Sequence, residues 1–87
     1  MTVELEQKIE IEVPEEAREI GINRITVHQD EVTIYIDDGF IQVPIYEPLG
    51  KTYRLLENGC KMLQLSNEAA QWIVVIVQLE LEKGASN

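Results

Sequence analysis

The sequence predicts a mainly β fold: a small antiparallel sheet or curled, barrel-like domain of roughly five to seven strands with at most one or two short helices. Three observations predict it. Apolar and polar residues alternate with a period of two along several segments. Pairs with turn chemistry, such as Asp38-Gly39, separate these segments, and five consecutive β-branched residues occupy positions 73–77. We assign residues 1–87 to a single domain, because no internal repeat divides them and a chain of this length builds one core.

The sheet is expected to be organised around a hairpin of residues 32–45. Asp38-Gly39 suits a two-residue type I′ turn, because glycine adopts positive φ freely and aspartate tolerates it. Counting outward from that turn places Tyr35 opposite Gln42 on one face. The apolar pairs expected on the other face are Ile36–Ile41, Ile34–Val43 and Val32–Ile45. Pro44 has no N–H to donate, so we expect its strand to be an edge or to contain a bulge.

Two elements are expected before this hairpin. Residues 3–13 alternate between apolar side chains and mainly glutamate, which predicts a strand with one face in the core and an acidic face in water. Residues 14–20 predict a short helix, because Pro14 suits its first position, acidic residues follow, and Gly21 ends it. The glutamates of the first strand also discourage edge-to-edge association.

Residues 24–28 predict a strand that joins the central hairpin. Across a turn at residues 29–30, the expected pairs are Val27–Val32 and Ile25–Ile34. These pairs lie on the face that the hairpin also assigns to the core, so the two turns agree on which face is buried. A meander of strands over 24–28, 32–37 and 40–45 follows.

Residues 51–65 leave two alternatives open. Asn58-Gly59 favours a hairpin that joins Tyr53–Glu57 to Lys61–Leu65, and we prefer this interpretation. The rival is a short helix over residues 51–57, with Gly59 near its C-terminal cap.

The C-terminal region combines a helix signal with a strand signal. Ser66 suits the N-cap of a helix and Glu68 suits its first turn, which predicts a helical start over residues 66–71. The β-branched run that follows is poor helix material and good strand material. We therefore expect one long strand over residues 73–82.

The net charge of −9 is unevenly distributed. Residues 1–19 carry seven acidic and two basic side chains, residues 20–47 carry five and one, and residues 48–87 carry four of each. Because such a surface repels nucleic acid and anionic membranes, we expect neither as a direct partner. The longest apolar run, Trp72 to Val77, is far shorter than the ~20 residues of a spanning helix, and no signal-peptide pattern is present. These features predict a cytoplasmic protein.

The residue inventory offers no catalytic, cofactor-binding or metal-binding set, so we do not expect an enzyme. Cys60 and His28 are the only cysteine and histidine, which excludes an internal disulfide and a Cys/His zinc site within one chain. The acidic pairs at residues 30–31 and 37–38 lie at opposite ends of one predicted strand, roughly 17 Å apart at ~3.3 Å per residue, too far to share a metal ion. One hypothesis with a site remains: an enzyme or ligand binder whose site is shared between subunits and uses His28 or Cys60 from more than one chain.

The predicted function is a non-catalytic, small acidic protein-protein interaction module or regulatory subunit. If no second layer covers the sheet face opposite the apolar pairs, Tyr35, Phe40 and Gln42 form a contact patch for a protein partner. Homodimerisation also fits, because a sheet this small covers both of its faces with difficulty.

The alternative is an acidic inhibitor that blocks the basic nucleic-acid groove of a nuclease or DNA-binding protein by imitating phosphate charge, as small anti-defence proteins do. Its expected contact residues are the glutamates of the first strand: Glu4, Glu6, Glu10 and Glu12. Binding through these charges would weaken steeply with salt, whereas an apolar interface would not. The other explanation of the acidic charge is that it serves only to keep the protein soluble.

The segment DDGFIQVPI, residues 37–45, resembles the DGR-x-I-x-VPL segment of a family of small β-rich bacterial domains. Phe40 stands where that segment has arginine. The resemblance covers about a tenth of the chain, and we assign no site residue from it.

Overall fold

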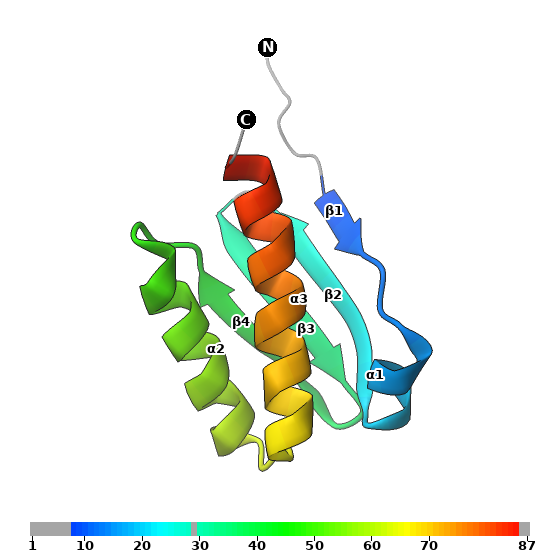
Figure 1. Ribbon diagram of the computed structural model, residues 1–87. Coiled ribbons are helices and arrows are strands. Elements are labelled where there is room, and N and C mark those ends of the chain that lie inside the picture. The colour runs from blue at the N-terminus through cyan, green and yellow to red at the C-terminus, as the bar shows by residue number, and fades with distance from the viewer. Residues whose placement is uncertain (1–7, 29, 86–87) are drawn as a thin grey trace.

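Four strands form one antiparallel sheet in the order β1-β2-β3-β4, which is also their order in the sequence. The strands are β1 (Lys8–Ile11), β2 (Ile22–His28), β3 (Glu31–Ile36) and β4 (Gly39–Pro44), and the helices are α1 (Glu15–Glu19), α2 (Leu49–Met62) and α3 (Asn67–Ala85). The computed structural model describes residues 8–28 and 30–85. Helices α2 and α3 lie side by side on one face of the sheet, and α1 lies in the connection between β1 and β2 (Figure 1).

The prediction of a mainly β fold is therefore wrong. The chain folds as α/β, with a four-stranded sheet and three helices in the described residues, and the two longest helices occupy most of the C-terminal half. The two errors are the hairpin preferred within residues 53–65 and the strand expected over residues 73–82, where the structure has α2 and α3. No helix among the described residues is long and apolar enough to cross a membrane.

Helix α3 replaces the strand expected over residues 73–82. Its buried side chains recur at spacings of three and four, which is the period of a helix face that packs on a sheet: Ala69, Ala70, Ile73, Ile76 and Val77. The expected helix start is confirmed, since the Oγ of Ser66 accepts a hydrogen bond from the Ala69 N–H at 3.1 Å. Burial of this face against the sheet outweighs the low helix propensity of the β-branched residues.

Helix α2 replaces the hairpin preferred for residues 53–65, and it is also longer than the rival helix over 51–57. Thr52, Leu56 and Cys60 are fully buried at a spacing of four, along one helix face. Gly59 lies inside the helix rather than at a turn or cap. It is packed against β4, because a Cβ atom at this position would lie 2.9 Å from Cγ2 of Ile41.

The end of α2 lacks the glycine that usually marks the end of a helix. Gln64 has a φ of 63°, and its N–H donates to the Lys61 carbonyl at 3.0 Å. The Leu65 N–H donates to the Cys60 carbonyl at 3.0 Å, which completes a Schellman motif. The left-handed position of this motif usually holds glycine, so glutamine there conceals the helix end from sequence analysis.

The central hairpin forms with a different register from the one predicted. Its two-residue turn is Asp37-Asp38, since Ile36 pairs with Gly39. Among the described residues positive φ occurs only at Gln64 and Gly21, so the turn is not of type I′. The observed pairs are Ile34–Ile41, Val32–Val43, Tyr35–Phe40, Thr33–Gln42 and Glu31–Pro44. The shift is two residues, an even number, so every side chain keeps its predicted face.

The other predicted elements of the N-terminal half are confirmed where the structure describes them. Strands β2 and β3 pair in the expected register, with Val27 opposite Val32 and Ile25 opposite Ile34. The first strand is formed over Lys8–Ile11. Residues 3–7 of the strand predicted over 3–13 lie outside the described residues, and Glu12 and Val13 do not belong to the strand. Pro14 is the N-cap of α1 rather than its first residue.

The core lies between the sheet and the two long helices, and its largest fully buried side chains include Ile22, Ile25, Ile34, Leu56 and Ile73. A buried polar contact joins the end of β4 to α2. The Thr52 hydroxyl accepts a hydrogen bond from the Tyr46 N–H at 2.7 Å and donates to the Pro44 carbonyl at 3.1 Å. The hydroxyl of this buried side chain therefore both accepts and donates a hydrogen bond.

Candidate interaction surface

The sheet has one open face. Helices α2 and α3 both lie on the opposite face, and among the described residues no element covers this one (Figure 1). Its side chains form three cross-strand rows: Arg24, Tyr35 and Phe40; Glu10, Thr26, Thr33 and Gln42; and Lys8, His28, Glu31 and Pro44. The contact patch was predicted only if no second layer covers it. Among residues 8–28 and 30–85, none does.

Two aromatic rings form the apolar part of this face. Tyr35 and Phe40 are directly opposite one another on β3 and β4, and their ring centroids lie 6.4 Å apart at an interplanar angle of 42°. Phe40 is 60% exposed and Tyr35 37% exposed. An aromatic pair in this geometry is favourable, yet most of the Phe40 ring still faces water.

Arg24 extends the aromatic pair across the sheet. Its guanidinium carbon lies 5.8 Å from the centroid of the Tyr35 ring, within range of a cation–π interaction. The same guanidinium donates to the Glu10 carboxylate, from Nε to Oε2 at 3.1 Å and from Nη2 to Oε1 at 3.4 Å. Because it is held from both sides, Arg24 presents its remaining donors in a fixed direction.

Sequence reasoning missed Arg24 as a member of the patch, although a signal was present. The predicted pairing of Val27 with Val32, continued along the two strands, places residue 24 opposite residue 35. The structure has this pair, just beyond an irregularity in the register between Ile22 and Arg24.

Gln42 shares the face but does not oppose Tyr35. It lies opposite Thr33, and its Nε2 donates to the Thr33 Oγ1 at 3.2 Å. Thr33 and the neighbouring Thr26 are buried although they point to the open face, since larger side chains flank them. The structure thus places all three predicted patch residues on one face and brings Tyr35 and Phe40 into direct contact.

The structure describes two of the four glutamates predicted to form a row on the first strand. Glu4 and Glu6 lie outside the described residues. Glu10 is paired with Arg24, and Glu12 follows the strand instead of belonging to it. Glu12 instead lines a shallow depression of about 430 Å³, together with Val13, Glu15, Arg18 and Glu19.

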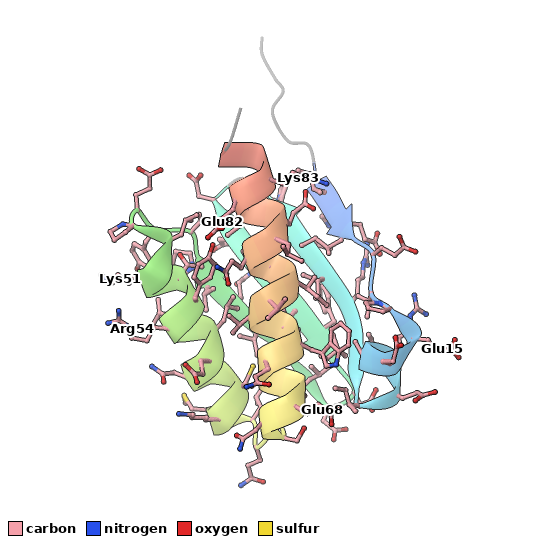
Figure 2. All side chains as sticks on the ribbon, in the orientation of Figure 1. Glu15, Lys51, Arg54, Glu68, Glu82 and Lys83 are labelled. Carbon is pink, nitrogen blue, oxygen red and sulfur yellow. The ribbon has the colours of Figure 1, made fainter. Side chains whose placement is uncertain are left out.

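Charge is separated over the molecule. The exposed side of α2 carries Lys51, Arg54 and Lys61 with one carboxylate, Glu57, whereas α1 carries Glu15, Glu16 and Glu19 with one base, Arg18. Figure 2 shows Lys51 and Arg54 on one side of the molecule and Glu15 on the opposite side. The open sheet face has little net charge, since Lys8 and Arg24 balance Glu10 and Glu31. No three His, Cys, Asp or Glu side chains among residues 8–28 and 30–85 are placed to hold a metal ion.

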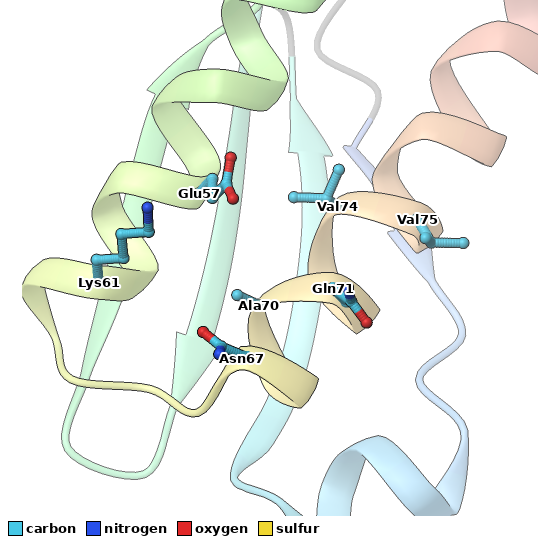
Figure 3. Close-up of a pocket in the computed structure, with 7 residues that line it drawn as sticks. All are labelled: Glu57, Lys61, Asn67, Ala70, Gln71, Val74 and Val75. Atoms are coloured by element: carbon cyan, nitrogen blue, oxygen red, sulfur yellow. The ribbon is translucent and has the colours of Figure 1, made fainter.

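A cavity of about 280 Å³ lies between α2 and α3 (Figure 3). Its lining residues are Glu57, Lys61, Asn67, Ala70, Gln71, Val74 and Val75. In Figure 3 the Glu57 side chain points from α2 toward Val74 of α3, whereas Val75 points away from α2. The lining contains no histidine, thiol or hydroxyl group, and its charged side chains are Glu57 and Lys61.

His28 and Cys60 do not come together. Cys60 is fully buried on α2, beneath the inner face of the sheet, while His28 belongs to the open face. Burial, with a contribution from the Glu57 carboxylate, raises the pKa of the Cys60 thiol to about 11. A buried, protonated thiol is a poor nucleophile, which argues against a shared site that uses this residue.

No protein-family model matches the chain, and searches of curated proteins and of solved structures gave no match. The short likeness of residues 37–45 to a β-rich bacterial family therefore leads to no family assignment.

Proposed function

We propose that this protein is a non-catalytic protein-protein interaction module that binds its partner through the open face of the sheet. The observation that carries the proposal is the exposed aromatic pair of Tyr35 and Phe40, with Arg24 fixed beside it. Tyrosine, phenylalanine and arginine are enriched in the centres of protein interfaces, where a few such residues contribute most of the binding energy.

The chemistry of this face defines the partner. Phe40 is the more exposed of the two rings and suits an apolar pocket on the partner. Arg24 and Gln42 beside it supply polar contacts, and both are already oriented by Glu10 and Thr33. Since acidic and basic side chains balance on this face, binding should depend little on salt.

The alternative is the acidic inhibitor of a nuclease or DNA-binding protein. It is supported by the net charge of −9 and by the exposed carboxylates of α1: Glu15, Glu16 and Glu19. These residues would meet the basic groove together with the glutamates predicted for it, Glu4, Glu6, Glu10 and Glu12. Such a complex would dissociate as salt is raised.

Site-specific photo-crosslinking distinguishes the two functions. A photoreactive phenylalanine analogue is placed at Phe40, at Glu15, or at Met62, which is 83% exposed at the end of α2 and serves as the control. Each protein is incubated with host lysate at ~50 mM and ~500 mM salt, over which the Debye length shrinks several-fold, and crosslinked proteins are identified by mass spectrometry.

We expect one partner to crosslink from position 40, at both salt concentrations, and not from position 62. Adding Tyr35→Ser to the same protein should remove that crosslink. Crosslinking from position 15 alone, to a basic nucleic-acid-binding protein and only at low salt, would support the acidic inhibitor instead. Equal crosslinking from positions 40 and 62 would contradict the proposed contact surface.

A further inference from the structure

Helix α3 carries an apolar stripe that the described residues leave largely in water. Val75 and Leu79 are 50% and 67% exposed, and Trp72 before them is half-buried. Because residues three and four apart on a helix lie one above the other, these side chains form one continuous stripe along the helix. Val75 points away from α2 (Figure 3), so the stripe does not face the neighbouring helix.

A hollow of about 270 Å³ lies on this stripe, and all the residues that line it belong to α3. They are Glu68, Gln71, Trp72 and Val75, which stand at positions i, i+3, i+4 and i+7. Four residues at this spacing form the hole that receives one side chain of a facing helix when two helices pack knobs-into-holes. The hollow therefore has the form of a receptor for one side chain of another helix.

A groove of about 390 Å³ follows on the same helix. Its lining on α3 includes a second set at i, i+3, i+4 and i+7: Ile76, Leu79, Glu80 and Lys83. Trp72 also lines it, and the end of β1 and the connection after it form its other side. The stripe thus has two successive holes, and Leu79 is its most exposed apolar side chain.

The stripe is complementary to itself in an antiparallel arrangement. Residues 72 and 79 lie equally far, along the helix, from the point between residues 75 and 76. If a two-fold axis passes through that point, Leu79 of each copy stands over the hollow of the other, and Trp72 of each copy stands over the groove of the other. One symmetric contact therefore fills both depressions, and it does so twice.

The charges on α3 agree with the same register. Glu68 and Lys83 are also equally far from that axis, at opposite ends of α3 (Figure 2). Antiparallel packing brings Glu68 of each copy near Lys83 of the other, whereas parallel packing in register brings like charges together. Lys83 is paired with Glu80 of its own chain at 3.8 Å, so in the antiparallel arrangement it lies between two carboxylates.

We propose that this protein forms a homodimer in which two copies of α3 pack antiparallel through this stripe, with Leu79 of each copy inserted into the Trp72-lined hollow of the other. The net charge of −9 opposes association, but at ~0.15 M salt charges more than ~8 Å apart are largely screened. Apolar contacts supply the affinity, and the Glu68–Lys83 pairs set the orientation.

The dimer leaves the open face of each sheet uncovered, because α3 lies on the opposite face (Figure 1). It therefore presents two copies of Tyr35 and Phe40. Together with the function proposed above, on which the dimer itself does not depend, this makes the protein a bivalent binding module.

Sedimentation equilibrium of the full chain at several concentrations, in ~0.15 M salt, tests the proposal. We expect a monomer–dimer equilibrium. Leu79→Lys should raise the Kd of the dimer by about tenfold or more, whereas Met62→Lys, the same change at an exposed position of α2, should leave it unaltered. Circular dichroism checks that both variants remain folded.

Charge reversal tests the orientation. Glu68→Lys should raise the Kd by about fivefold, because the new lysine meets Lys83 of the other copy, and adding Lys83→Glu to the same chain should restore it. Glu57→Lys changes the net charge equally but lies in the cavity between α2 and α3, so it should not weaken the dimer.

A disulfide tests the position of the axis. Residue 75 lies beside the axis, so Val75→Cys should form an intermolecular disulfide under mild oxidation much faster than Met62→Cys. The wild-type chain gives the background, and its Cys60 is fully buried.

A chain that stays monomeric at all concentrations would overturn the proposal. A dimer that survives Leu79→Lys but is lost in Phe40→Ser would also overturn it, because that dimer would form through the open face. A double charge variant that dimerises no better than Glu68→Lys alone would exclude the antiparallel contact. A monomeric chain would leave the crosslinking test of the open face unaffected.

Discussion

Gly59 of α2 lies directly against Ile41 of β4, so close that a Cβ atom on residue 59 would stand 2.9 Å from Cγ2 of the isoleucine. Side chains of folded proteins do not approach so closely, and the helix reaches the sheet only because residue 59 has no side chain. Glycine within a helix costs about 1 kcal/mol relative to alanine. Here that cost is offset by the close packing of the helix on β4.

Substitution of two glycines in the same helix should have opposite effects. Gly59→Ala should lower the free energy of unfolding by about 1–3 kcal/mol, since Ile41 or the helix must shift. Gly50→Ala should raise it by about 0.5–1 kcal/mol, because a Cβ there meets open space and alanine favours the helix. Urea denaturation measures both, and a change of the same sign in the two variants would contradict the packing argument.

The end of α2 offers a stabilising substitution. Gln64 adopts a left-handed backbone conformation that is unfavourable for any residue with a side chain. Gln64→Gly should raise the free energy of unfolding by about 0.5–1 kcal/mol, after allowance for the greater freedom of glycine in the unfolded chain. Gln64→Ala is the control and should give no such gain, because alanine retains the strain. Thermal unfolding of the two variants side by side provides the comparison.

The errors of fold prediction share a physical cause. In α2 the pair Asn58-Gly59 has the local chemistry of a turn, but Gly59 is there for the tertiary contact with Ile41. In α3 the β-branched run prefers a strand locally, yet burial of Ile73 and Val77 on the sheet selects a helix. The spacing of four between Thr52, Leu56 and Cys60 was the helical signal available and was missed. Local preference thus predicted the strands of the sheet correctly, but not the two helices that pack on it.

The buried thiol should make stability depend on alkaline pH. The pKa of Cys60 is raised from 9.0 to about 11, first by burial and then by Glu57. Between these values the unfolded chain releases the thiol proton while the folded chain keeps it. Stability is therefore fully present below pH 9.0 and falls as the pH rises toward about 11.

Denaturation as a function of pH, with Cys60→Ala as the reference, tests this linkage. The wild-type protein should lose on the order of 2 kcal/mol more than the variant across the window. Tyr53, whose pKa is raised by burial and by Glu82, is present in both proteins and cancels in the comparison. Parallel pH profiles would show that the thiol titrates alike in the folded and unfolded chains.

The open face should contribute little to stability, because its aromatic side chains are largely exposed. Phe40→Ala should lower the free energy of unfolding by about 1 kcal/mol or less, most of it from the contact with Tyr35. Ile41→Ala, one residue further along the same strand on the buried face, should lower it by about 2–5 kcal/mol. Chemical denaturation of the pair gives the ratio, and equal losses would mean that Phe40 is a structural residue.

The face on which Tyr35, Phe40 and Gln42 lie was predicted, although the fold class was not. Tyr35, Phe40 and Gln42 share a face because strand alternation assigns faces by parity, and the register error of the central hairpin was even. The contacts of Arg24 with Glu10 and Tyr35 depend on three strands at once, so no single hairpin predicted them.

Each strand of the sheet pairs with the strand next to it in the sequence. The chain therefore closes only short loops as the sheet assembles, and each closure loses little chain entropy. Proteins rich in such local contacts fold faster than those that must pair distant segments. The meander of β2, β3 and β4 can form as a unit, and α2 and α3 follow it directly in the chain, in the order in which they emerge during synthesis.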